Sequence, residues 1–146
     1  MFYRCLLITA ALLATLTLPA AASAGTHPDS RHASERTERL ALQTADAFWS
    51  QRGRAACPHP RIEYASLANR ASADAFVGPN LAAAYCVIRM SSRHTWRGRA
   101  GALDFCWTIV HERGHQAGLE HASAGIMSSD GGDKPPAACT RLFAKR

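Results

Sequence analysis

The sequence predicts a small α+β fold with two long helices, a short mixed sheet and a short C-terminal helix. Two observations predict it. Apolar residues recur at helical spacing over residues 34–52 and over residues 102–116. Residues 61–67 and 83–90 carry the aromatic and β-branched residues that are typical of strands. The chain of 146 residues suffices for one hydrophobic core, and we expect one domain over residues 25–146.

The first 24 residues have the features of a secretory signal peptide. Arg4 precedes an apolar run over residues 6–18, Pro19 breaks that run, and Ala-Ser-Ala at residues 22–24 offers small side chains for cleavage. The run is too short to span a bilayer comfortably. We therefore expect a secreted or periplasmic protein, without stable membrane anchoring after removal of residues 1–24.

Four cysteines remain after the signal peptide, and an even number suggests two disulfides in an exported chain. They are Cys57, Cys86, Cys106 and Cys139. Three pairings are possible, and the sequence does not choose among them. Their wide spacing does not resemble a cysteine-based zinc knuckle.

The basic residues are scattered along the chain. There are 17 Lys and Arg against 11 Asp and Glu, a net charge of +6, and loss of the signal peptide removes one arginine and leaves +5. Scattered arginines favour solubility and a solvated basic surface. We therefore expect no nucleic-acid partner, and we expect a monomer.

The first helix and the connector after it are the first elements of the mature chain. The apolar residues of this helix recur at spacings of three and four and can form one face. They are Leu40, Ala41, Ala45, Phe48 and Trp49. Gly53 can end the helix, and Cys-Pro-His-Pro at residues 57–60 resists helix formation.

Strands and loops are expected between the two long helices. Residues 61–67 alternate apolar with charged or small side chains, which predicts a short strand. Residues 69–80 are rich in Ala, Ser and Asn and end in Gly-Pro-Asn, so we expect a loop and a turn. Residues 83–90 form the second predicted strand, and residues 91–101 form a polar loop. A short helix is expected within residues 135–146, after two prolines.

The most informative stretch has the pattern HExxHxxGxxH. Histidines four residues apart on a helix lie on one side of it, so His111 and His115 can bind one ion. Gly118 can adopt a left-handed conformation, end the helix and turn the chain, so that His121 supplies a third imidazole. Three imidazoles leave a fourth position of Zn²⁺ open to water, and the pattern therefore predicts a catalytic zinc site.

Glu112 is adjacent to the first of these histidines and is not needed as a ligand. Beside a metal-bound water it could take a proton and later pass it to a leaving amine. This arrangement predicts hydrolysis of an amide bond, with Glu112 as the general base.

The phase of the second helix places two histidines opposite its apolar face. With about 100° per residue and Ala102 at 0°, the other apolar residues fall within about 80° of Ala102. They are Phe105, Cys106, Ile109 and Val110. His111 and His115 fall at about 180° and 220°, so a helix packed on a core would present both to a cleft.

The extended motif resembles the signature of the metzincin clan of zinc metallopeptidases, in which a tight turn carrying a methionine follows. Met127, within Gly-Ile-Met-Ser, lies six residues after His121 and matches that Met-turn. The resemblance implies a zinc peptidase with a reduced sheet, in which Met127 forms an apolar floor beneath the imidazoles. It also implies that a strand before the active-site helix pairs with extended protein or peptide substrates. Residues 83–90 stand in that position, and an ordinary core strand is the alternative.

The chain departs from that family in several respects. It is short for such a domain, and only two strands are recognisable in the sequence. Ala122 follows the third histidine where some members carry a subfamily-specific residue, and no tyrosine follows closely after Met127. The subfamily is therefore not assigned.

Several other polar and aromatic residues are expected to have structural roles only. Four histidines stand alone in polar segments and are expected to be solvated: His27, His32, His59 and His94. Asp104 lies on the histidine face of the second helix, and we expect a helix-start carboxylate favoured by the helix dipole. Trp49 and Trp107 are expected in the core.

Two alternatives to a peptidase stay open. A metal could stabilise a disulfide-bonded exported binding module with little or no activity, or the motif could be accidental in a small disulfide-rich protein. Glu112 favours the enzyme, because a purely structural site has no use for an unligated carboxylate. The coincidence of motif, helical phase and Met-turn argues against an accident.

Overall fold

The computed structural model describes residues 31–68, 71–76, 86–129 and 134–144. The expected signal peptide and the Gly-Pro-Asn turn lie outside the described residues. The helices are α1 (Glu35–Ser50), α2 (Gly98–Gln116) and α3 (Ala137–Ala144), and the strands are β1 (Arg61–Ala65), β2 (Ala73–Phe76) and β3 (Val87–Ser91). The predicted α+β class is confirmed. Within this described part, no helix combines the length and apolar character needed to cross a bilayer.

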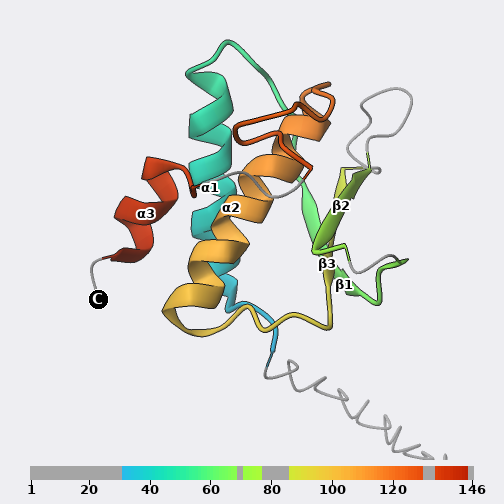
Figure 1. Ribbon diagram of the computed structural model, residues 1–146, viewed down its shortest axis with the longest axis vertical. Helices are drawn as coiled ribbons and strands as arrows, with labels where there is room; N and C mark the ends of the chain where they lie inside the picture. Colours follow the sequence, from blue (N-terminus) through green and yellow to red (C-terminus); the bar gives the residue numbers. More distant parts are fainter. Residues whose placement is uncertain (1–30, 69–70, 77–85, 130–133, 145–146) are drawn as a thin grey trace, which may run out of the picture.

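Helix α2 lies at the centre of the molecule. Figure 1 shows the sheet on one side of α2, with α1 and α3 on the other side. The sheet is mixed and has the order β1-β3-β2, in which β1 runs parallel to β3 and β2 runs antiparallel to β3. Helix α2 therefore contacts α1 and α3 on one side and β2 on the other.

Local sequence explains where α1 begins and which face it buries. The Ser34 side chain caps the helix by accepting a hydrogen bond from the Thr37 backbone N–H at 3.2 Å. Ala41, Ala45 and Trp49 are buried, as the helical spacing predicts. The indole Nε1 of Trp49 donates to the Val110 carbonyl at 2.7 Å. This hydrogen bond fixes how far α1 is shifted along the axis of α2.

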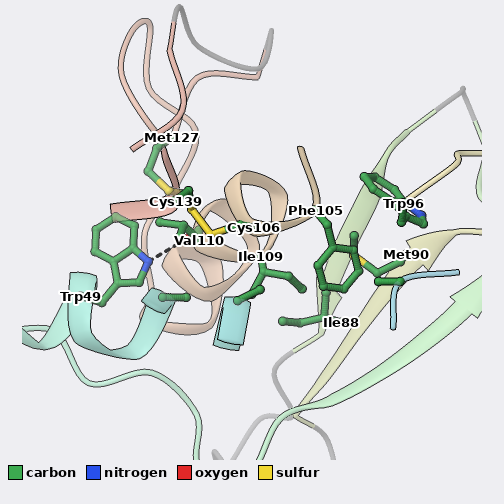
Figure 2. Close-up of a cluster of buried hydrophobic side chains, with 13 residues drawn as sticks. Trp49, Ile88, Met90, Trp96, Phe105, Cys106, Ile109, Val110, Met127 and Cys139 are labelled. Atoms are coloured by element: carbon green, nitrogen blue, oxygen red, sulfur yellow. Dashed lines mark hydrogen bonds between the residues drawn. A yellow bond between two sulfur atoms is a disulfide. The ribbon is translucent and has the colours of Figure 1, made fainter. Parts of the chain in front are cut away.

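The hydrophobic core extends along both flanks of α2. Figure 2 shows Phe105 and Ile109 directed toward Ile88 and Met90 of β3. On the other flank the buried side chains meet α1, α3 and the loop after α2; they are Trp49, Cys106, Val110, Met127 and Cys139. The apolar side of α2 predicted from its phase is therefore the buried side.

The sheet differs from the prediction in one strand. Residues 73–76 form β2, although residues 69–80 were expected to be a loop. The segment Ala-Asp-Ala-Phe is short and poor in strand-forming residues, so β2 depends on pairing with β3, from Ala73 opposite Met90 to Phe76 opposite Val87. Since β3 is paired on both sides, the segment expected as a cleft rim is a core strand where it is described, and β2 is one of the two edge strands of the described sheet.

Helix α2 begins earlier than predicted, at Gly98 and not at Ala102. Its first turn is Gly-Arg-Ala-Gly, in which no apolar side chains recur at helical spacing. For this reason the sequence predicts a polar loop there. Trp96, just before the helix, is buried, and its Nε1 donates to the Ser91 carbonyl at 2.9 Å. The earlier start moves Asp104 out of the first turn, so the interpretation of Asp104 as a helix-start carboxylate is wrong.

The four cysteines form two disulfides, as predicted, and the structure selects one of the three pairings. Cys57 pairs with Cys86, and Cys106 pairs with Cys139. The first bridge joins the connector after α1 to the start of β3, and the second joins α2 to α3. All four cysteines are buried.

Reduction of both disulfides should strongly destabilise the fold. Their sequence separations of 29 and 33 residues imply about 3–4 kcal/mol each from the restricted unfolded chain. Chemical denaturation of residues 25–146, refolded with and without reductant, measures the difference in free energy of unfolding. Identical curves, with reduction verified by thiol counting, would show that the bridges contribute nothing.

Candidate metal centre

The three predicted histidine ligands converge on one point. The Nε2 atoms of His111 and His115 are 3.1 Å apart, those of His111 and His121 are 3.3 Å apart, and those of His115 and His121 are 3.2 Å apart. Three nitrogens bound tetrahedrally at about 2.0–2.1 Å from one ion lie about 3.3–3.4 Å apart. The imidazoles are therefore already at metal-binding spacing, and the set can hold a metal ion.

Backbone carbonyls orient two of the rings. The Nδ1 atom of His111 lies 2.7 Å from the Ile126 carbonyl, and that of His115 lies 2.8 Å from the Leu119 carbonyl. Each Nδ1–H donates to its carbonyl, which leaves the Nε2 lone pair of the neutral ring facing the centre. Burial, and then the neighbouring histidines, lower the pKa of His111 and favour this neutral form.

Gly118 turns the chain as the sequence predicts. Its φ of 81° is in the left-handed region, and the Leu119 N–H donates to the Gly114 carbonyl at 3.0 Å as the helix ends. The turn has two consequences for the site. It brings His121 back to the two helical histidines, and it places the Leu119 carbonyl against His115.

The turn around Met127 packs directly against α2 at Gly114. The Ala122 N–H donates to the Met127 carbonyl at 2.8 Å, which ties the residue after His121 to this turn. Met127 is 6% exposed. A Cβ atom on Gly114 would overlap the Met127 sulfur and would lie 2.7 Å from Cζ2 of Trp49. Position 114 therefore needs a glycine, because the helix backbone approaches both side chains closely.

Arg113 of α2 is a buried charged residue that ties the histidine-bearing helix to α1. Its side chain is 3% exposed and forms an ion pair with Asp46 of α1. It also donates to the Cys57 carbonyl at 2.7 Å and to the Gln116 Oε1 at 2.6 Å. Arg113 falls at about 20° on the helical wheel, on the apolar side of α2. A charged residue on a buried side needs a partner, so this position could have indicated a buried ion pair.

Glu112 is buried between two clefts. One cleft of about 470 Å³ and another of about 430 Å³ share the lining residues Ala73, Glu112 and His121. Glu112 is 5% exposed, and burial, followed by the nearby charge of Asp74, raises the pKa of its carboxyl to about 7. Asp74 itself is held by Arg89 at 2.9 and 2.5 Å.

The raised pKa of Glu112 predicts how the stability of the metal-free protein depends on pH. Between about pH 4.5 and 7 the unfolded chain has lost this proton and the folded chain keeps it, so stability falls as pH rises. Glu112→Gln should remove this fall and gain up to about 3 kcal/mol over the wild type above pH 7. Denaturation of both proteins in chelator at pH 4.5 and 8 measures it. If the two proteins differed in free energy of unfolding by the same amount at both pH values, Glu112 would ionise in the folded protein as it does in the unfolded chain.

The tryptophans and the isolated histidines differ in their burial. Trp49 is in the core, as predicted, whereas Trp107 is half-buried and lines the larger cleft, together with the exposed His94 and Asp104. His32 is not simply solvated, because its ring stacks on Tyr64 with centroids 3.8 Å apart. Two isolated histidines remain: His59 is exposed, and His27 lies outside the described residues.

Comparison of the chain with protein-family models, with curated proteins and with solved structures finds no match. The assignment of the centre therefore depends on its own residues and their geometry.

Proposed function

We propose that the mature chain is an exported zinc-dependent peptidase. In this proposal His111, His115 and His121 hold Zn²⁺, and Glu112 is the general base. The observation that carries it is the spacing of the three Nε2 atoms, 3.1–3.3 Å, with two of the rings oriented by backbone carbonyls.

The donor set favours zinc. Neutral imidazoles suit Zn²⁺, and three protein ligands with a fourth open position are typical of catalytic zinc sites. When bound, the ion would acidify a coordinated water and polarise the scissile carbonyl. The exposed side of His121 and the two adjoining clefts leave room for water and substrate on this side of the centre.

Glu112 supplies the proton transfers. Its carboxylate would take a proton from the attacking water and return it to the departing amine nitrogen. A base whose pKa lies near the working pH transfers protons efficiently in both directions. Burial raises the pKa of the Glu112 carboxyl to about 7 when no ion is bound, and a bound cation would lower it from there toward a carboxylate that is ready to accept a proton.

The edge strand β2 offers a place for an extended substrate. Ala73 lines both clefts, and β2 is the outermost strand of the described sheet on that side. A peptide can add to such an edge through backbone hydrogen bonds. The metzincin resemblance extends this proposal: Met127 would serve as the apolar floor of the site, and β2 would replace residues 83–90 as the rim.

Export is supported by the two buried disulfides, which are typical of oxidising compartments. A zinc-stabilised binding module is the second candidate, and the buried, unligated Glu112 at the junction of two clefts argues against it.

Zinc content and peptide cleavage of the mature protein test the proposal. We expect one zinc per chain, cleavage of casein and of a quenched-peptide library, inhibition by chelator, and recovery on addition of Zn²⁺. Full zinc occupancy without cleavage of any peptide would favour the binding module instead.

A further inference from the structure

The larger cleft extends along α2, from His111 and His121 of the candidate metal centre to Asp104. Asp104, Trp107 and Thr108 lie on one side of α2 at positions i, i+3 and i+4, and all three line this cleft. Asp104 is exposed, and it makes no ion pair with any residue in the described ranges. Trp107 is half-buried, so part of its indole surface faces the cleft.

Apart from histidines, the ionisable residues that line the two clefts are all acidic, although the chain as a whole is basic. Although the chain has 17 Lys and Arg, none of those in the described segments lines either cleft. Four carboxylates line them: Asp74, Asp104, Glu112 and Glu120. Asp74 is already paired with Arg89, and Glu112 is buried. In the larger cleft Asp104 is therefore the exposed carboxylate that can attract a cation.

Distance determines how long the bound side chain must be. Asp104 and His111 are seven residues apart on the helix, an axial separation of about 10.5 Å. An extended Lys or Arg side chain reaches roughly 6–7 Å from its Cα atom, and the Asp104 side chain covers roughly 2–3 Å more. A peptide residue beside the metal centre could thus contact Asp104 through a long basic side chain, whereas a short side chain at the same position would not reach it.

We propose that Asp104 and Trp107 form a subsite that selects a lysine or arginine side chain of the peptide substrate, an inference that rests on the proposed peptidase function. The ammonium or guanidinium group pairs with the Asp104 carboxylate, and the aliphatic stem lies against the Trp107 indole.

Two measurements test this subsite, one of binding and one of cleavage. For binding, the zinc-loaded, full-length mature Glu112→Gln variant is titrated with fluorescent peptides that differ at one position, arginine against norleucine. We expect the arginine peptide to bind about tenfold more tightly, and Asp104→Asn added to this variant should reduce the ratio to less than about threefold. Glu35→Gln, at the exposed start of α1, is the matched control and should keep the ratio. Equal affinities, no measurable binding of the arginine peptide, or an unchanged ratio in Asp104→Asn would each overturn the subsite.

For cleavage, the ratio of kcat/KM for the same peptide pair is measured with Glu112 intact. We expect it to favour arginine and to fall in Asp104→Asn. If the arginine peptide bound selectively but the wild type cleaved no peptide, the proposed peptidase function would be wrong and the proposed subsite would stand. Cleavage with no preference for arginine would remove the subsite and leave the peptidase.

Discussion

Replacing Glu112 by glutamine is expected to abolish peptide cleavage and to leave the metal bound. Glutamine keeps the shape of the side chain, and it cannot accept the proton of the attacking water. A positioned general base contributes about 10²–10⁴-fold to the rate. Because Glu112 lies apart from the three converging Nε2 atoms, its loss removes no ligand.

The measurement combines kcat/KM on a cleaved peptide with zinc per chain. Glu35→Gln is the control, because it removes an exposed carboxylate far along the chain from the centre. A Glu112→Gln protein that retains zinc and cleaves as fast as the wild type would show that another group handles the proton.

His115→Ala is expected to lose both the metal and the activity. The Nε2 atom of His115, a proposed ligand, lies 3.1 and 3.2 Å from those of the other two histidines, so its removal leaves only two imidazoles of this set. Loss of a hydrogen-bond partner of a ligand costs about 10–100-fold in affinity, and loss of the ligand itself should cost more. Alanine preserves the helix, so the effect is not expected to come from unfolding.

Zinc affinity by competition with a chromophoric chelator, together with circular dichroism, measures this variant. The control is His59→Asn, because His59 is exposed and has a φ of 50°, a conformation that asparagine tolerates. Wild-type zinc affinity in His115→Ala, with the fold intact, would remove His115 from the ligand set.

The predictable parts of the fold are those specified by local sequence. The face of α1, the apolar side of α2 and the turn at Gly118 follow from spacing and from one residue's conformational freedom. Strand β2 and the first turn of α2 could not be predicted, because their residues carry no period of their own. These two segments are held by β3 and by the packing of Trp96.

The candidate site also has a part that local sequence predicts and a part that it does not predict. Its three histidines lie within eleven consecutive residues, so one motif brings them together. The groups that hold this motif in place come from far along the chain. The partner of Arg113 is Asp46, 67 residues away, and the surroundings of Gly114 include Trp49. Such contacts depend on the packing of α1 on α2, which no spacing within the motif reveals.

The coordination of zinc in the zinc-loaded protein tests directly whether the three histidines form one metal site. A crystal structure or X-ray absorption spectrum should show one ion bound by the Nε2 atoms of His111, His115 and His121 at about 2.0–2.1 Å, with oxygen in the fourth position. An ion bound elsewhere, or bound by fewer than these three imidazoles, would contradict the account.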